Sequence, residues 1–429
     1  MKKVLMVAYA FPPVGGAGVQ RIVKFIKYLN EFCWSADAVS VQNPSVPLVD
    51  DSLRRELPSD CTVFRSKTFE PSYAVKSSVK NSSDGKMSLK SWLVDSAKKC
   101  ANSILLPDAQ LLWWPHTFFL IRKLLKGRSY SVIFVSGPPF STFPLVVFVA
   151  KLHGIPAIVD YRDEWSFSRD NWENSAKTPL ARLIDSWMEN YVVRNAMAIT
   201  VASPEYELSL KDRFPAADGK IITITNGYDP ADFAGIDFFQ EKDNKDGSVT
   251  ILYTGTVWRA TSFQGLLEGI RILAHADLAA SKKLVLRIVG RIVPEELPVI
   301  AEMQHYIHVE TIDYLPHTEI FKEMAAADVL LLTLSDLPGA GKIIPGKTFE
   351  YLAAPLPVLA IVPNGVTADI VRNEKNVSTA LPGDHNSICN FLRNILNEPP
   401  KRESREGIEK YSRPHLTQTL VELFNLIGK

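Results

Sequence analysis

The feature that most constrains this chain is the alternation of short, unbroken apolar runs with amphipathic segments. The runs lack the strict apolar–polar alternation of a sheet with one wet face, so they predict strands buried on both faces, as in parallel sheets. The helical patterns between them argue for a doubly wound α/β architecture. The predicted strands cover residues 4–10, 131–136, 156–161, 197–202, 250–255, 284–290, 328–334 and 356–361.

A chain of 429 residues with this many strands is too large for one open sheet, which makes two α/β domains the more economical arrangement. The best seam is residues 230–248, which are charged, contain glycines and separate two strand-like segments. We therefore predict a first domain over residues 1–235 and a second over residues 248–409.

Composition excludes several classes of protein. With 46% hydrophobic and 22% charged residues the chain is typical of folded proteins, and its net charge of +1 gives no overall reason to expect a nucleic-acid partner. Four scattered cysteines predict neither a structural metal site nor a disulfide framework and favour a reducing compartment. No apolar run reaches about 18 residues, so we expect no membrane span and a cytoplasmic location. The N-terminal apolar run stops at Pro12 and Pro13, so a buried first strand explains it better than a signal peptide does.

Residues 66–100 differ from the rest of the chain because they hold seven lysines against three acids, with Trp92 and Leu93 as apolar points. A solvated loop is the simpler interpretation. The alternative is peripheral attachment to an anionic membrane surface, on the inner face of the membrane, or to a lipid-linked substrate.

Two loops after predicted strands are candidates for ligand binding. In residues 11–21, glycines stand between a strand and a helix start, where backbone N–H groups can approach an anion, although a tight turn without a ligand also fits. The G-x-G-x-x-G spacing of a dinucleotide site is absent there. In residues 160–165, three acids and an arginine follow a strand directly, as either a ligand site or an internal salt-bridge cluster.

A third loop, residues 339–352, is rich in glycine and leads to a helix predicted to begin near Pro345. Lys342 and Lys347 would make this corner attractive to anions, and Glu350, one turn into the helix, could accept hydrogen bonds from ribose hydroxyls. The letters GKIIPGKT also match a P-loop, but Pro345 removes an N–H that a phosphate cradle needs, so a kinase or ATPase is the lesser interpretation.

Seven strings occur in order along nearly the whole chain. They are FPPVGGAGVQR (11–21), SGPPFSTF (136–143), DYRDEW (160–165), TNGYDPADF (225–233), ILYTGTVWR (251–259), YLPHTEIFKEMAAADVLLLTL (314–334) and KIIPGKTFEYLAAPLPVLA (342–360). The set resembles the family-four retaining glycosyltransferases. The resemblance implies a GT-B architecture of two Rossmann-like domains, acceptor-side first and nucleotide-sugar-binding second, with residues 410–429 crossing back onto the first.

The resemblance also implies the site. Glu350 matches the second glutamate of the family's Glu-x7-Glu signature, the one usually on the ribose, whereas Lys342 stands where the first glutamate would be. For catalysis we expect Asp163, Arg259 and Lys347, with no metal and no cofactor. The expected donor-binding residues are Gly15, Gly16, Asn226, Gly255, Thr256, Gly290, Lys342, Gly346, Lys347 and Glu350.

The function this implies is transfer of a hexose, with retention, from a nucleotide-diphosphate sugar, with UDP as the expected nucleotide. The acceptor would be a glycan or a lipid-linked molecule in surface polysaccharide or glycoconjugate biosynthesis. Fixed cations and backbone amides would stabilise the departing diphosphate without a metal. Two alternatives remain open, a GT-B nucleotide-sugar epimerase and an inactive nucleotide-sugar-binding protein.

Overall fold

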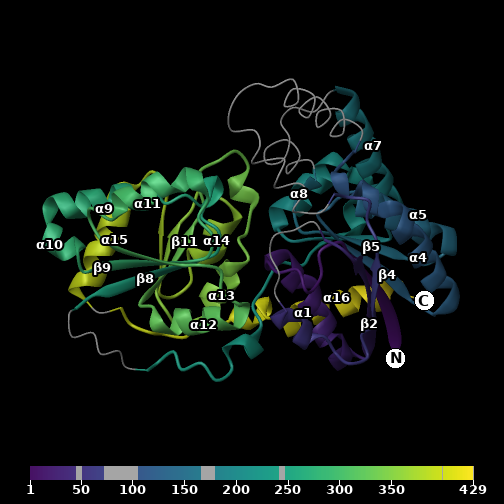
Figure 1. Ribbon diagram of the computed structural model, residues 1–429, viewed down its shortest axis with the longest axis horizontal. Coiled ribbons are helices and arrows are strands. Elements are labelled where there is room, and N and C mark those ends of the chain that lie inside the picture. The colour runs from purple at the N-terminus through teal and green to yellow at the C-terminus, as the bar shows by residue number, and fades with distance from the viewer. Residues whose placement is uncertain (45–50, 72–104, 166–178, 241–246, 399, 429) are drawn as a thin grey trace. The chain divides into compact units, whose positions relative to one another are not determined.

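The computed structural model describes residues 1–44, 51–71, 105–165, 179–240, 247–398 and 400–428 (Figure 1). The chain divides into two compact units. The first unit is Met1–Thr225 with Leu416–Lys429, and the second unit is Asn226–His415. The predicted lysine-rich segment lies outside the described residues from position 72 onward. Of its earlier charges, Lys67 is exposed and Glu70 is buried.

The first unit is built on a parallel sheet of seven described strands in the order β3-β2-β1-β4-β5-β6-β7. Counted from β1, this is the Rossmann order, in which the chain reverses direction across the sheet between β1 and β4. The strands are β1 (Lys2–Ala8), β2 (Trp34–Val41), β3 (Val63–Ser66), β4 (Val132–Gly137), β5 (Ala157–Tyr161), β6 (Ala198–Val201) and β7 (Ile221–Thr223).

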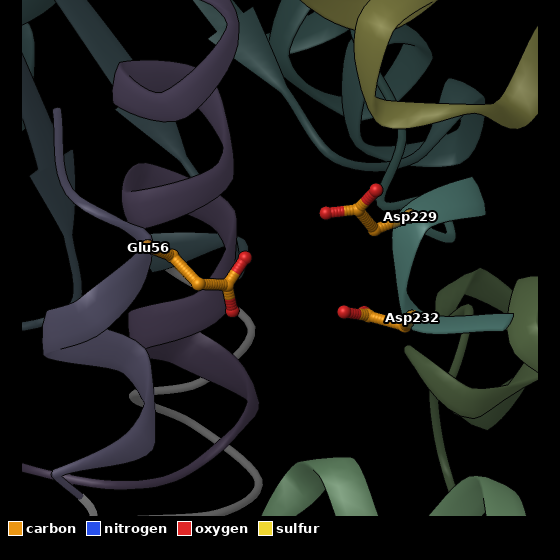
Figure 2. A group of neighbouring side chains, drawn as sticks. All are labelled: Glu56, Asp229 and Asp232. Atoms are coloured by element: carbon orange, nitrogen blue, oxygen red, sulfur yellow. The ribbon is translucent and has the colours of Figure 1, made fainter. Parts of the chain in front are cut away.

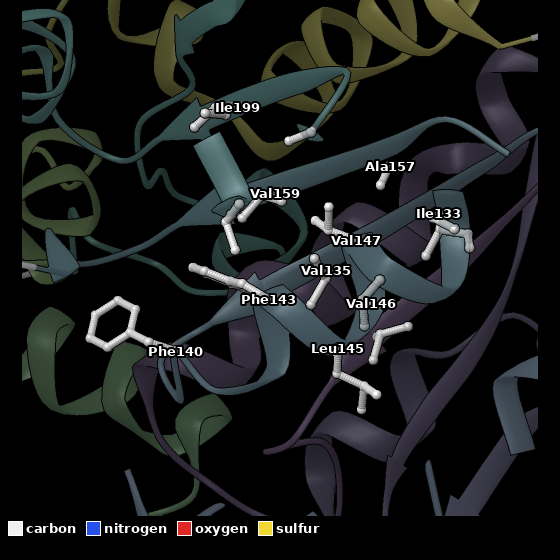
Figure 3. Close-up of a cluster of buried hydrophobic side chains, with 14 of the residues drawn as sticks. Ile133, Val135, Phe140, Phe143, Leu145, Val146, Val147, Ala157, Val159 and Ile199 are labelled. Carbon is white, nitrogen blue, oxygen red and sulfur yellow. The ribbon is translucent and has the colours of Figure 1, made fainter. Parts of the chain in front are cut away.

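Helices cover both faces of this sheet (Figure 1). One layer is α4 (Trp114–Gly127), α5 (Thr142–His153), α7 (Pro179–Asn195) and α8 (Pro204–Arg213), and Figure 3 shows part of the core beneath it. The other layer contains α1 (Ala17–Leu29) and the C-terminal α16 (Arg413–Ile427). The apolar stripe of α1, from Val19 to Leu29, is buried in that second core.

The C-terminal helix belongs to the first unit from Leu416 onward, although it follows the second unit in sequence. Leu416, Leu420 and Phe424 are buried in the same core as β1 and β2, and Trp34 Nε1 donates to Asn425 Oδ1 at 3.1 Å. Each fully buried Leu or Phe contributes about 1.5–3 kcal/mol, so this docking stabilises the unit substantially.

The second unit repeats the topology with a parallel sheet of six described strands, in the order β10-β9-β8-β11-β12-β13. Its chain reversal lies between β8 and β11. The strands are β8 (Val249–Thr254), β9 (Leu284–Val289), β10 (His308–Ile312), β11 (Val329–Thr333), β12 (Val358–Ile361) and β13 (Val377–Ala380). The helices are α9 (Gln264–Ala276), α10 (Leu278–Ser281), α11 (Leu297–Met303), α12 (His317–Ala326), α13 (Lys347–Ala353), α14 (Val366–Val371) and α15 (His385–Asn397).

The division between the units falls earlier than the predicted end of the first domain at 235. Residues 226–235 group with the second unit because their contacts lie there: Phe233 packs edge-on against Phe321, with ring centroids 4.8 Å apart. At the other end, residues 410–415 also group with the second unit, since the Tyr228 N–H donates to the Tyr411 carbonyl at 3.1 Å. The unit boundary therefore precedes the charged seam instead of lying within it.

No helix within the described ranges combines the length and the apolar character that crossing a membrane requires.

Candidate active site

In the first unit, the predicted glycine turn joins β1 to α1 at the chain reversal. Gly16 is the N-cap of α1 with φ of 109°, in the left-handed region that favours glycine, and no atom lies within 4 Å of the position its Cβ would take. Gly15 and Gly16 are both half-buried. The turn therefore requires glycine for its backbone and leaves open space beside it.

The cluster of charges at 160–165 is largely internal, as one of the two sequence interpretations predicted. Asp160 is fully buried and accepts hydrogen bonds from Arg21 (3.0 and 2.8 Å), Ser136 (2.7 Å) and Thr200 (2.7 Å). Burial alone would raise the pKa of Asp160, but the Arg21 charge and these hydrogen bonds outweigh it and hold the pKa below its usual range. Arg21 also donates to the carbonyl of Ile224, so the network ties three strands, β4, β5 and β6, and the residue after β7 to α1.

The remaining charges of this loop divide between internal pairs and the surface. Arg162 donates to the carbonyls of Gly18, Gly137 and Pro138, and buried Glu164 pairs with Arg213 at 3.4 Å. Asp163 is exposed and has no hydrogen-bonded or ion-paired partner among the described residues. Of the three acids, Asp163 alone is presented to solvent, as a residue that meets a ligand must be.

In the second unit, hydrogen bonds to its own carbonyl groups hold the loop after β8 in place. Tyr253 Oη and Thr261 Oγ1 both donate to the Thr256 carbonyl at 2.8 Å, and the Ser335 N–H donates to the Ala260 carbonyl at 2.8 Å. Its exposed positions include Gly255, Thr256 and Arg259. The loop thus presents an ordered backbone at the carboxyl edge of the sheet, where open α/β sheets bind ligands.

Gly255 and Gly290 allow the loops after β8 and β9 to touch. Gly290 has φ of 132°, and a Cβ there would lie 2.4 Å from the Gly255 carbonyl oxygen. Gly255 has φ of 116°, and its own Cβ would lie 3.4 Å from Lys347 Nζ. The positive φ favours glycine at both positions. At Gly290 a side chain would also collide with the Gly255 backbone, whereas at Gly255 the Lys347 ammonium would lie at ordinary contact distance.

Lys347, the first residue of α13, places its ammonium at the end of β8. Nζ donates to the Thr254 carbonyl at 2.6 Å and lies 3.4 Å from the centroid of the Tyr253 ring. One turn later Tyr351 Oη accepts from the Thr254 N–H at 3.0 Å, so the same helix holds the strand end at two points. No carboxylate in the described part of the chain lies at salt-bridge distance from this ammonium.

The position of the Lys347 ammonium is costly for a cation. The residue keeps partial solvent contact, but loss of hydration at its inward-turned end lowers the pKa of Lys347 well below its usual range, and the negative charge of Glu350 opposes this only in part. A cation with no carboxylate of the described residues at salt-bridge distance, at the carboxyl edge of the sheet, is a candidate anion-binding group by electrostatics alone.

Arg259, in the 3₁₀ turn Arg259–Thr261, is exposed and has no hydrogen-bonded or ion-paired partner within the described ranges. Lys342 ends the 3₁₀ turn Ala340–Lys342, and Gly346 is the N-cap of α13. Asn226, the first residue of the second unit, is half-buried. These positions stay predictions as donor contacts.

Glu350 lies in a group that the sequence did not reveal. His317 Nε2 lies 3.0 Å from Glu350 Oε1, and His317 Nδ1 lies 3.7 Å from Asp232 Oδ2. The three side chains are nearly buried. His317 stands inside one of the family-like strings, and its role went unrecognised because its two partners lie 33 and 85 positions away. Among described residues, it is the side chain that orients Glu350.

Three carboxylates, Glu56, Asp229 and Asp232, are drawn in Figure 2. Each has partners in its own unit. Glu56 accepts from Lys24 and Lys27 in the first unit, at 2.6 and 2.9 Å. In the second unit, Asp229 caps its turn by accepting from the Ala231 N–H at 2.9 Å, and Asp232 faces His317. Each of the three carboxylates therefore has a hydrogen-bonding or charged partner within its own unit.

The P-loop interpretation of GKIIPGKT does not fit the structure. The hydroxyl at the position of Thr348 would have to reach a metal ion bound to phosphate, yet the Thr348 side chain is fully buried. The burial of Thr348 therefore argues against the kinase or ATPase interpretation of these residues.

Family models match both units: a "Glycosyl transferase 4-like domain" over residues 100–227 and "Glycosyl transferases group 1" over residues 248–398, together more than half of the chain. The chain belongs to the family-four-like glycosyltransferases. A search of curated proteins finds no match to its sequence.

Solved structures similar to this glycosyltransferase share its fold over their whole length. A sucrose-phosphate synthase from Thermosynechococcus elongatus has a TM-score of 0.65 at 14% identity, covering 99% of each chain. Alr3699/HepE from Anabaena, in complex with UDP, has 0.59 at 13%, covering 99% of this chain and 100% of that one. The lipopolysaccharide outer core galactosyltransferase WaaB has 0.60 at 11%, with the same coverage. The predicted GT-B fold of two Rossmann-like units is thereby confirmed.

Proposed function

We propose that this glycosyltransferase takes its sugar from a nucleotide diphosphate, with UDP as the first candidate, and that the second unit binds this donor. The observation that carries the proposal is the Lys347 ammonium, held at the end of β8 beneath exposed Gly255 with no carboxylate of the described residues at salt-bridge distance. A diphosphate bound against the Gly255–Thr256 backbone would balance the positive charge of the Lys347 ammonium. The structures of HepE with UDP and UDP-glucose support the choice of nucleotide by analogy of fold.

The proposed reaction proceeds with retention. The bond between the anomeric carbon and the β-phosphate oxygen breaks, and its electron pair stays on the phosphate. The acceptor hydroxyl attacks from the same face and passes its proton to the departing phosphate oxygen. Negative charge grows on the diphosphate during this step, so a cation and fixed backbone donors at that place stabilise the transition state more than the ground state. Lys347 and Arg259 are the cations we assign, and Asp163 is the first-unit candidate.

The acceptor we propose is a glycan or a lipid-linked molecule in surface polysaccharide or glycoconjugate assembly. The similarity of WaaB in fold supports this class. Lys342 stands where the family has its first glutamate. We therefore propose that this protein recognises the transferred sugar differently from other members of the family.

A thermal-shift screen of UDP-, GDP-, ADP- and dTDP-sugars tests the donor directly. A nucleotide at 100 times its Kd should stabilise the protein by about 2.7 kcal/mol. A responding donor is then incubated with glycan and lipid-linked acceptors, and the anomeric proton coupling of the product reports retention or inversion. Epimerised nucleotide sugar formed without acceptor would favour the epimerase alternative, and binding without turnover would favour the inactive one.

We predict that Glu350→Ala raises the Kd for UDP by about 10- to 100-fold, because a hydrogen bond to a charged group contributes about 1.5–3 kcal/mol. Isothermal titration with UDP measures this. The Glu350 carboxylate is the proposed acceptor for the ribose hydroxyls. An unchanged Kd in a folded variant contradicts the assignment.

We predict further that His317→Ala acts through Glu350 as the loss of a positioning residue. Without the 3.0 Å contact to Nε2, the carboxylate loses its fixed orientation. KM for the donor should rise about tenfold with a smaller change in kcat, and His317→Gln, whose amide can still donate, should recover part of the loss. The matched control is His305→Ala, at an exposed histidine of the same unit. Equal effects on KM in both variants would refute the positioning role.

A further inference from the structure

The outer surface of α4, α5 and α7 in the first unit has an unusual composition. The three helices cover the same face of the sheet, side by side in the order α4, α5, α7, above one shared core (Figure 1). Their core-facing residues explain the fold, but their outward residues do not follow the usual polar pattern of a surface helix. We call this surface the α4–α5–α7 face.

Large apolar side chains stand on the α4–α5–α7 face with 50% to 68% of their surface exposed. On α7 they follow a helical stripe: Leu180, Leu183 and Trp187 are spaced by three and four residues, and the Trp187 ring stacks on the Tyr191 ring with centroids 6.2 Å apart. The other members are Phe119 on α4, with Phe148 and Leu152 on α5. Scattered exposed apolar residues are ordinary, but six on adjacent helices form a patch that calls for a partner.

The charges on the α4–α5–α7 face have one sign. Arg122, Lys123 and Lys126 on α4, Lys151 on α5, and Arg182 and Arg194 on α7 are its cations, and all but half-buried Arg122 are exposed. The two acids of these helices point inward. Asp185 accepts from Trp165 Nε1 at 2.9 Å, and Glu189 pairs with Arg213 at 2.9 Å.

Basic and apolar residues share the same stripes, as Phe119, Lys123 and Lys126 do on α4. The neighbouring helix α8 offers a contrast, because its exposed Leu208 is accompanied by exposed Asp212. A mixed-sign surface is what solvation alone produces, so the absence of exposed acids along all of α4, α5 and α7 is a specific feature.

We propose that the α4–α5–α7 face docks on an anionic membrane surface. Apolar side chains, one of them a tryptophan, would enter the boundary between headgroups and acyl chains, while Lys and Arg keep their charges among the anionic headgroups. The occupant follows from charge complementarity. A second copy docked by the same face would set six cations against six, which disfavours a symmetric dimer. The proposal uses only described residues and is independent of the predicted role of residues 66–100.

Vesicle co-sedimentation of the full chain tests the proposal, with phosphatidylglycerol–phosphatidylcholine vesicles against pure phosphatidylcholine at low and high salt. Each basic residue near an anionic leaflet contributes about 1 kcal/mol, so Lys123→Glu/Lys126→Glu/Lys151→Glu should lower the partition coefficient about 100-fold or more. The matched control is Lys282→Glu/Lys283→Glu/Lys322→Glu, with the same charge change at exposed positions of the second unit. It should keep most of the binding.

A second pair of variants tests the apolar part. Leu183→Ser/Trp187→Ser should weaken binding at high salt, where the charges are screened, whereas Phe239→Ser/Leu426→Ser, at exposed positions elsewhere, should not. All variants are checked for the UDP-induced thermal shift, which keeps this result separate from the donor assignment. The proposal is overturned if the unaltered protein ignores anionic vesicles, if both triple variants bind alike, or if the face variants instead dissociate a dimer.

Discussion

Replacing Lys347 with methionine should lower kcat by about 10²- to 10³-fold, the usual effect of removing one group that stabilises transition-state charge. Methionine keeps most of the length of the side chain and removes the ammonium that lies 2.6 Å from the Thr254 carbonyl. KM for the donor should change less than kcat, because the charge on the diphosphate grows as the glycosidic bond breaks. Steady-state kinetics with the responding donor measures both.

Stability separates this role from a structural one. Lys347 has lost hydration and has no carboxylate at salt-bridge distance in the described chain, so the neutral variant should be as stable as the natural protein or more stable. The control is Lys322→Met, at an exposed lysine paired with Glu319 on the surface of α12, which should leave kcat unchanged. A Lys347→Met variant with full activity contradicts the assignment, and one that fails to fold points to a structural lysine.

The lowered pKa of Lys347 gives the reaction a pH dependence with a definite sign. Lysine is charged below its pKa, so kcat/KM for the donor should fall as pH rises through a value well below 10.5. Arginine stays charged over this range, and any activity that remains in Lys347→Arg should lack this alkaline decline. An identical decline in both proteins would assign the titration to another group.

Replacing Asp160 with asparagine should destabilise the first unit by about 3–5 kcal/mol, because it leaves Arg21 buried without its charge partner. Arg21 has 1% of its surface exposed, and its Nη2 lies 2.8 Å from Asp160 Oδ1. Urea unfolding followed by tryptophan fluorescence is well suited to the measurement, since seven of the eight tryptophans precede Thr225 and report the first unit.

A double-mutant cycle distinguishes the pair from general damage. Once Asp160 is asparagine, Arg21→Met should cost little more, since the buried charge that was left unpaired is removed. The pH dependence follows from the lowered pKa of Asp160: the stability this carboxylate contributes is present above the usual aspartate pKa of 3.8 and is lost as pH falls below it. Additive losses in the double variant would contradict the coupling.

The eight strands predicted from apolar runs are all present. The strands that were not predicted show which kinds of strand an apolar run cannot identify. In β2, Ser35, Asp37 and Ser40 interrupt the apolar pattern although the strand is buried throughout. Asp37 is tolerated because Lys3, Arg128 and Tyr130 meet it at 2.6 to 3.0 Å. Those partners come from other elements, so the sequence near Asp37 does not announce them. The edge strands β10 and β13 lack a continuous apolar run because they are partly exposed and therefore carry polar residues.

The sequence by itself determined the fold class and the family, because apolar runs report burial locally and the ordered strings keep their spacing whatever the packing. It also identified Lys347 and Glu350 as candidates, since charges after a glycine-rich loop are visible without coordinates, and the family resemblance added Gly255. Only the tertiary structure decided which charges are available for a ligand. It paired Asp160 with Arg21, left Asp163 exposed, and set His317 beside Glu350. Whether a charged group is balanced depends on partners distant in sequence, and folding alone brings those partners together.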